Sequence, residues 1–398
     1  MATTPRTSRR GPRRMVRALI AGACVPATAA GLVLSASAAN ADSSQDPAHH
    51  DLQRLPLNIG IVKNLDIGRG GKIVFADSSG PKVKVKEFTE ASHNRGKLRT
   101  IATLPAGSAN AAQSAKGDTW VIYGLAGGPE EGPPPAGTES ATIWRIDKHG
   151  KAERVLDIGH FQTTKSPDPY DLEKKPGDSN PYDLEPLRDG SVLVADAGGN
   201  DLLRIWPNGK AHTVACFPDQ LVSTDQVPPP VRKQMGPLPP KILAETVPTG
   251  VVLGHDGKAY VSELIGFPFP LHSSGVWRVD PNGHNVGCNG SPKHPVKPGK
   301  KVVTGFSGIN DVTTDKWGNL YVTELSVKGI WTVEGALESG DPSGVAGLGR
   351  VTKVTKHGDK HVVGETSLTI PGSAVVTRRG HVYVSDMSLL GAKLVRIA

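Results

Sequence analysis

The chain has 398 residues, of which 37% are hydrophobic and 21% charged, and its formal net charge is +8 at pH 7. Six arginines lie between Arg6 and Arg17, and without them the net charge falls to about +2. A nucleic-acid partner is therefore disfavoured, because the remaining basic residues form no stripe. No membrane-length apolar segment follows residue 41, so no transmembrane segment is expected in the mature chain.

The first 41 residues are expected to be a secretory signal peptide. The arginine-rich start is followed by an apolar, small-residue run from Ala18 to Ala38, and Ala39-Asn40-Ala41 has the small-x-small pattern of a cleavage site. The mature chain then begins at Asp42 and is extracellular. The alternatives are a membrane anchor, twin-arginine export through Arg9-Arg10, and a lipid on Cys24.

Before the first repeated unit lies the segment Leu52–Ile59, which has no neighbour to pair with in the pattern. The last unit ends at Ala398, just after its third strand. We expect Leu52–Ile59 to pair with Leu394–Ile397 as the outer strand of that unit, because an open seam would leave an exposed strand edge.

From residue 71 onward one unit recurs: a glycine turn, a short apolar strand and, in five of six copies, an acid. The six copies are Gly71–Asp77, Gly117–Tyr123, Gly190–Asp196, Gly257–Glu263, Gly318–Glu324 and Gly380–Asp386. Six such units predict an all-β fold, a six-bladed β-propeller of four-stranded antiparallel blades over residues 42–398.

Each blade is expected to contain four strands, a to d, with the glycine turn between a and b. The a–b and c–d turns then lie on one face of the disc, here called the short-turn face. The other face, called the long-loop face, carries the long segments Gly124–Ala141, Gly159–Asn180, Phe217–Val247, Leu264–Gly275 and Leu325–Gly349. Because rigid scaffolds carry function on their elaborated loops, we expect the binding site on the long-loop face.

The acids that end the strands b are Asp77, Asp196, Glu263, Glu324 and Asp386. Five acids at equivalent positions suggest a metal site. The favoured interpretation is structural, since a carboxylate at a strand end caps nearby backbone amides. The ring also keeps these five positions far from one another.

The start of strand a is where the strands converge on the central channel. Seven residues before each turn glycine lie Asn64, Asn110, Asp183, Gly250, Asp311 and Ser373, and one position earlier come residues that include Tyr182 and Asn310. A ring of Asn and Asp could hold a divalent cation such as Ca²⁺, with Asp183, Asn310 and Asp311 as candidate ligands, or could bind hydroxyls. The alternative is a water-filled channel that binds nothing specific.

Two further features have open interpretations. Phe267-Pro268-Phe269-Pro270 is an apolar loop on the long-loop face that either packs down as a plug or forms a wall for a ligand. Cys216 and Cys288 remain after the leader and are a possible disulfide. Catalytic motifs are absent from the sequence, so the catalytic residues stay unknown.

Ser179–Ile205 and Val247–Val279 resemble the ScyD/ScyE family of exported bacterial propellers, above all in the elements AGGNDLLR and ELIGFPFP. This resemblance implies six blades and brings no assigned reaction. A broader similarity to NHL-repeat and gluconolactonase-like propellers implies a metal held by asparagines at the start of strand a. The matching positions here are Tyr182, Thr249, Asn310 and Gly372, of which only Asn310 is an asparagine.

Together these features predict a secreted, monomeric binding or scaffold module that takes a small molecule, a glycan or a protein at the channel mouth on the long-loop face. The residues expected to form this site are Asn64, Asn110, Tyr182, Asp183, Asn310, Asp311, Phe267 and Phe269. The alternative is a metal-assisted hydrolase or lactonase, in which the same ring would polarise a carbonyl.

Overall fold

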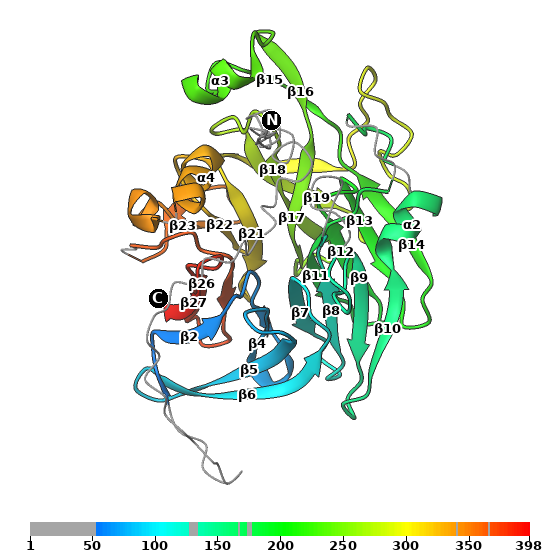
Figure 1. Ribbon diagram of the computed structural model, residues 1–398. Helices are drawn as coiled ribbons and strands as arrows, with labels where there is room; N and C mark the ends of the chain where they lie inside the picture. The colour runs from blue at the N-terminus through cyan, green and yellow to red at the C-terminus, as the bar shows by residue number, and fades with distance from the viewer. Residues whose placement is uncertain (1–52, 127–133, 166–167, 173–176, 340, 365–366) are drawn as a thin grey trace, which may run out of the picture.

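The computed structural model describes residues 53–126, 134–165, 168–172, 177–339, 341–364 and 367–398. Six antiparallel sheets stand around a central axis as the blades of a propeller (Figure 1). The six-bladed all-β fold expected from the repeat is confirmed. The proposed leader, with Cys24 and the cleavage site, lies outside the described residues.

Each blade runs outward from an innermost strand a. Blade 1 contains β3 (Asp66–Ile67), β4 (Ile73–Asp77), β5 (Val83–Ala91), β6 (Arg95–Leu104) and an added edge strand β1 (Gln53–Arg54), with the short 3₁₀ turn η1 (Arg69–Gly71) between β3 and β4. Blade 2 contains β7 (Ala109–Gln113), β8 (Thr119–Tyr123), β9 (Thr142–Ile146) and β10 (Ala152–Asp157). Blade 3 contains β11 (Pro181–Pro186), β12 (Val192–Asp196), β13 (Asp201–Ile205) and β14 (Ala211–Cys216).

The second half of the ring is built in the same way. Blade 4 contains β17 (Thr246–Leu253), β18 (Ala259–Ile265), β19 (Ser274–Val279) and β20 (Lys300–Phe306). Blade 5 contains β21 (Ile309–Thr314), β22 (Leu320–Glu324), β23 (Arg350–Val354) and β24 (Lys360–Val362). Blade 6 contains β25 (Ala374–Val376), β26 (Val382–Asp386), β27 (Ala392–Arg396) and, from the other end of the chain, β2 (Leu57–Gly60).

The glycine of each repeat is explained by its backbone. All six turn glycines have positive φ, from 72° at Gly257 to 99° at Gly117. An L side chain is strained in this region, so glycine is the residue that lets strand a turn back into strand b.

The ring closes through the N-terminal strand, as expected. Leu57 lies opposite Leu394 and Asn58 opposite Lys393 in an antiparallel pair. Ile59 is only 1% exposed and packs in the apolar cluster that joins blades 6 and 1. The contact therefore combines strand pairing with core burial, although it joins Leu57–Gly60 to Ala392–Leu394 rather than the predicted Leu52–Ile59 to Leu394–Ile397.

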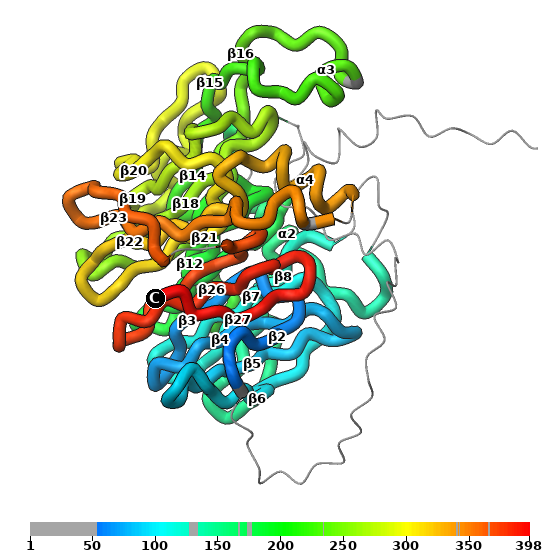
Figure 2. Tube along the Cα trace, turned by 90° about the vertical axis from the view of Figure 1, so that its left-hand side faces the viewer, coloured from blue at the N-terminus to red at the C-terminus, as the bar shows by residue number. Residues whose placement is uncertain are grey.

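The long connections form most of the irregular structure. α2 (Ile158–Lys165) and the hairpin of β15 (Gln220–Ser223) and β16 (Lys241–Ala244), with α3 (Pro229–Met235) at its tip, are d–a connections. α4 (Ile330–Ser339) and η2 (Pro342–Val345) belong to the b–c connection of blade 5. Figure 2 shows α3 and α4 on the same side of the disc. None of the helices in the described ranges is both long and apolar enough to cross a membrane.

A disulfide joins Cys216 and Cys288, which are 72 residues apart. It links β14 of blade 3 to the c–d connection of blade 4. Beside it, Val286 forms a parallel bridge with Ala215, and the Cys216 amide donates to the Val286 carbonyl at 2.9 Å. This loop of blade 4 therefore extends the outer edge of blade 3.

Candidate ligand-binding site

The acids that end the strands b have a structural role. The carboxylate of Asp196 accepts a hydrogen bond from the Asn180 amide at 2.6 Å, and Asp386 accepts one from the Thr369 amide, also at 2.6 Å. Asp77 and Glu324 accept equivalent bonds from amides 16 and 17 residues earlier in the chain. These four acids therefore fasten the incoming chain to their own blade, which supports the capping interpretation.

At the long-loop end of the channel, an aromatic cluster fills the space. Phe269 is 2% exposed, and its ring centroid lies 5.3 Å from that of Trp331 on α4. Phe267 packs edge-on against Trp331 at 6.1 Å, and the Trp331 indole N–H donates to the Pro268 carbonyl at 3.0 Å. Of the two open interpretations, the packing favours a plug.

Near this cluster, the described residues enclose a space of about 30 Å³, which Lys63, Tyr182, Asn310 and Glu334 help to line. The Tyr182 hydroxyl donates to Oδ1 of Asn310 at 2.6 Å, and Nδ2 of Asn310 donates to the Gly372 carbonyl. Burial, and after it the charge of Glu338, raises the pKa of Glu334 to about 7. The described residues therefore leave little open space at this end of the channel.

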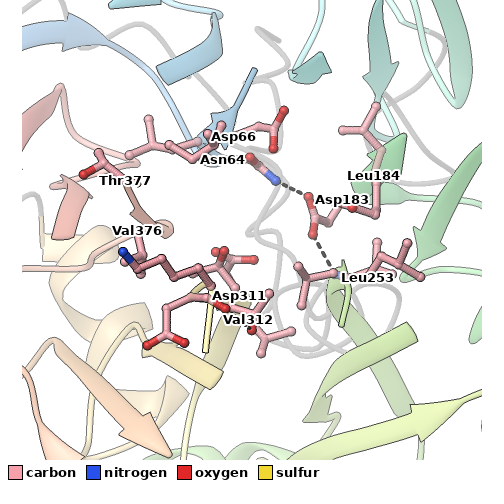
Figure 3. Close-up of a pocket in the computed structure, with 18 of the residues that line it drawn as sticks. Asn64, Asp66, Asp183, Leu184, Leu253, Asp311, Val312, Val376 and Thr377 are labelled. Atoms are coloured by element: carbon pink, nitrogen blue, oxygen red, sulfur yellow. Dashed lines mark hydrogen bonds between the residues drawn. The ribbon is translucent and has the colours of Figure 1, made fainter. Parts of the chain in front are cut away.

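The larger cavity extends the other way. Its volume is about 280 Å³, and it runs from Asn64, Asp183 and Asp311 to the a–b turns of the short-turn face, where His255, Lys316 and Arg378 line it. Figure 3 shows Asn64, Asp66, Asp183 and Asp311 gathered around this space. The ring that we expected at the long-loop mouth thus forms the inner end of a cavity whose outer end lies on the short-turn face. α4 and the aromatic cluster are the physical reason for this difference.

Both carboxylate oxygens of Asp183 accept hydrogen bonds at the inner end of the cavity. Its Oδ1 accepts from Nδ2 of Asn64, and its Oδ2 accepts from the Val251 amide at 2.6 Å. Burial, and after it the charge of Asp311, raises the pKa of Asp183 well above its ordinary value. Oδ1 of Asn64 is buried and has no hydrogen-bond partner. The inner end therefore contains one buried acceptor whose hydrogen-bonding capacity is not used.

Two further acids, Asp66 and Glu185, line the same cavity and were missed in the sequence. Each lies two residues after a ring position, Asn64 or Asp183, so the two-residue period of a strand places it on the same face. This two-residue period is the sequence signal from which Asp66 and Glu185 could have been predicted as lining residues. Burial raises the pKa of Asp66 to about 6, and burial followed by the charge of Asp66 raises the pKa of Glu185 well above its ordinary value.

The remaining expected site residues lie elsewhere. Asn110 is 4% exposed, and its Nδ2 donates to the Tyr182 carbonyl. It is not among the residues that line either cavity. Phe267 and Phe269 also lie outside both linings. The structure thus brings Asn64, Asp183 and Asp311 together and separates them from the other five residues.

The proposed Ca²⁺ ligands were tested against the hydrogen bonds of their donor atoms. Both carboxylate oxygens of Asp183 and both polar atoms of Asn310 already have partners. In the part of the chain that the structure describes, no group of three or more His, Cys, Asp or Glu side chains is arranged to hold a metal ion. These hydrogen bonds do not support a metal at Asp183, Asn310 and Asp311, and the Ca²⁺ site stays a prediction.

Comparison with known proteins identifies no family. No family model matches the sequence, and no curated protein matches it. Among solved structures, an inactive variant of virginiamycin B lyase from Staphylococcus aureus is similar over 87% of this chain and 99% of its own, with 14% identity and a TM-score of 0.41. The PQQ-bound aldose sugar dehydrogenase from Streptomyces coelicolor is similar over 88% and 98%, with 11% identity and a TM-score of 0.48. At these values neither likeness assigns an activity or a ligand to this chain.

Proposed function

We propose that this chain is a monomeric binding module whose central channel holds a small ligand rich in ammonium or hydroxyl donors. The observation that carries the proposal is the inner half of the 280 Å³ cavity, where Asp66, Asp183, Glu185 and Asp311 converge. Within the described ranges, no Lys, Arg or His forms an ion pair with any of these four acids. A positive or hydrogen-bond-donating ligand would stabilise buried acids that have no ion-pair partner.

The shape of the cavity supports a ligand rather than a purely structural role. Amide capping accounts for some of the oxygens, such as Oδ2 of Asp66, which accepts from the Gln113 amide at 2.8 Å. It does not account for the unpartnered Oδ1 of Asn64 or for the open volume. Concave sites with a few convergent polar groups are the usual form of small-ligand pockets.

Export and family membership belong to the same proposal. The arginine-rich start and Ala39-Asn40-Ala41 support secretion. The resemblance of Ser179–Ile205 and Val247–Val279 to the ScyD/ScyE propellers supports membership in that family. The metal-assisted hydrolase has no comparable support, because Asn310 is fully engaged by Tyr182 and Gly372.

The test uses glucosamine, which offers one ammonium and several hydroxyl groups. Calorimetric titration at pH 7 should give a Kd of about 1 mM or lower. The double variant Asp66→Asn/Glu185→Gln should weaken this binding at least about tenfold, because it replaces two carboxyl groups with neutral amides and keeps the side-chain shapes. Asp225→Asn/Asp359→Asn, two exposed acids away from the channel, is the matched control and should bind as the wild type does. Equal affinity in all three proteins would contradict the proposal.

A further inference from the structure

The short-turn face carries a basic residue in every a–b turn. Five of these residues lie two positions before the turn glycine and one lies one position before it, and all six are exposed. They are Arg69, Lys116, Arg188, His255, Lys316 and Arg378. Because the a–b turns surround the end of the channel, these residues form a basic collar around the mouth of the cavity.

The acids of the same turns do not neutralise the collar. Asp189 pairs with Arg204 at 2.7 Å, and Asp256 pairs with Arg278 at 2.8 Å. Asp118 pairs with Arg145 in the same way. In these three blades, the arginine of strand c thus forms an ion pair with the acid of the a–b turn. Within the described parts of the chain, no collar residue forms an ion pair.

Asp315, the acid nearest to the collar in the cavity lining, is also engaged. It is 3% exposed and accepts from the Trp317 and Asn319 amides at 2.9 and 3.0 Å. Nζ of Lys353 lies 3.8 Å from its carboxylate. Lys316 and Arg378 form no ion pair with a described residue, and Nζ of Lys316 lies 3.5 Å from the Arg378 carbonyl and 4.5 Å from the centroid of the Trp317 ring.

The cavity is consequently bipolar, with acids at its inner end and unpaired cations at its mouth. Along the chain, Glu185 in β11 comes three positions before the turn residue Arg188, and Asp311 in β21 comes five positions before the turn residue Lys316, so the acids lie deeper in the channel than the turns. We propose that the ligand carries a phosphate or carboxylate at the end that faces the short turns, with its ammonium or hydroxyl groups directed inward. This inference rests on the proposed function and adds the ligand class, an amino- or hydroxyl-bearing organic anion that enters from the short-turn face.

Matched probes test the anionic end separately from the inner end. Glucosamine 6-phosphate should bind the wild type at least about tenfold more tightly than glucosamine, because charge-assisted bonds to Lys316 and Arg378 are added. Its affinity should fall as the salt concentration rises, since the mouth is exposed to solvent. Inorganic phosphate alone should bind weakly, because it cannot reach the acids.

The variant Lys316→Met/Arg378→Met removes two collar charges and keeps most of the side-chain volume. It should lose the advantage of glucosamine 6-phosphate over glucosamine, so that the two probes bind the variant with affinities within about twofold of each other. Lys116→Met/Arg188→Met is the matched control: it makes the same charge change in turns of the same face, at residues that do not line the cavity. Unchanged melting temperatures would show that both variants are folded.

The outcomes separate the two proposals. If glucosamine binds and the Asp66→Asn/Glu185→Gln variant weakens it, but the phosphate adds no affinity, the anionic end is wrong and the channel site stands. If both collar variants weaken the phosphorylated probe equally, the effect comes from overall charge and the assignment to Lys316 and Arg378 is wrong. If neither probe binds, both proposals are overturned.

Discussion

The Val251 amide of blade 4 donates a hydrogen bond to Oδ2 of Asp183 of blade 3 at 2.6 Å. The same relationship recurs around the channel. The Gln113 amide donates to Asp66, and the Leu65 amide donates to the Ser373 hydroxyl at 2.6 Å. An innermost strand has one edge without a strand partner, so side chains of the preceding blade satisfy its amides. The channel acids therefore join neighbouring blades as well as line the cavity.

This double role predicts a dependence of stability on pH. The pKa of Asp66 is raised from 3.8 to about 6 in the folded protein, so between these values the folded state binds more protons than the unfolded state. Its contribution to stability is full below about pH 4 and is lost as the pH rises through about 6. As the pH rises through this range, the free energy of unfolding of the wild type should fall by roughly 1–2 kcal/mol more than that of Asp66→Asn. This value allows for solvent screening, because the Asp66 side chain is partly exposed.

The measurement is the melting temperature from pH 4 to pH 8 for the wild type, Asp66→Asn and the exposed-acid control Asp225→Asn. As the pH rises, the melting temperature of Asp66→Asn should increase relative to that of the wild type. A difference that stays constant over this range, or that changes equally with Asp225→Asn, would contradict the raised pKa.

The closure of the ring by β2 predicts a large effect of N-terminal truncation. Deleting residues 42–60 removes a strand of blade 6 and the buried Ile59, so the melting temperature should fall by more than about 10 °C or the protein should aggregate. Deleting residues 42–52 leaves β1 and β2 in place and serves as the control. Equal melting of the two truncated proteins would show that the strand pairing does not hold the ring.

The disulfide predicts a smaller and specific loss. Cys216→Ala/Cys288→Ala removes a cross-link that closes a segment of 72 residues, and the free energy of unfolding should fall by about 2–4 kcal/mol. Reduction of the wild type with dithiothreitol should lower its melting temperature to about that of the variant. The melting temperature of the variant itself should not change on reduction. A reductant effect of the same size in both proteins would assign the loss to something other than this bond.

Much of the fold follows from local sequence, whereas the open end of the channel does not. The turn glycines, such as Gly190, and the apolar strands that follow them are local signals, so the six blades and the seam at Leu57 could be predicted. The plug depends on Trp331 meeting Phe269 from another blade, and no local pattern encodes such a contact. The period that places Glu185 beside Asp183, and the recurrent basic residue before each turn glycine, were readable but were not used.

Export is tested apart from the fold. If the leader is cleaved as its pattern indicates, protein secreted by an expression host should begin at Asp42 when its N-terminus is sequenced. Mutating Ala39 and Ala41 to Asp should block cleavage, because the enzyme site requires small side chains. A secreted protein that retains Met1, or that carries a lipid on Cys24, would contradict this prediction.

The most direct test of the bipolar channel is a crystal structure of the protein soaked with glucosamine 6-phosphate. The predicted result is electron density inside the 280 Å³ cavity, with the amine within about 3 Å of Asp66 or Glu185 and the phosphate beside Lys316 and Arg378. Density in the reverse orientation would overturn the assignment of the collar. An empty channel at saturating concentration, or density only on the long-loop face, would contradict the channel site itself.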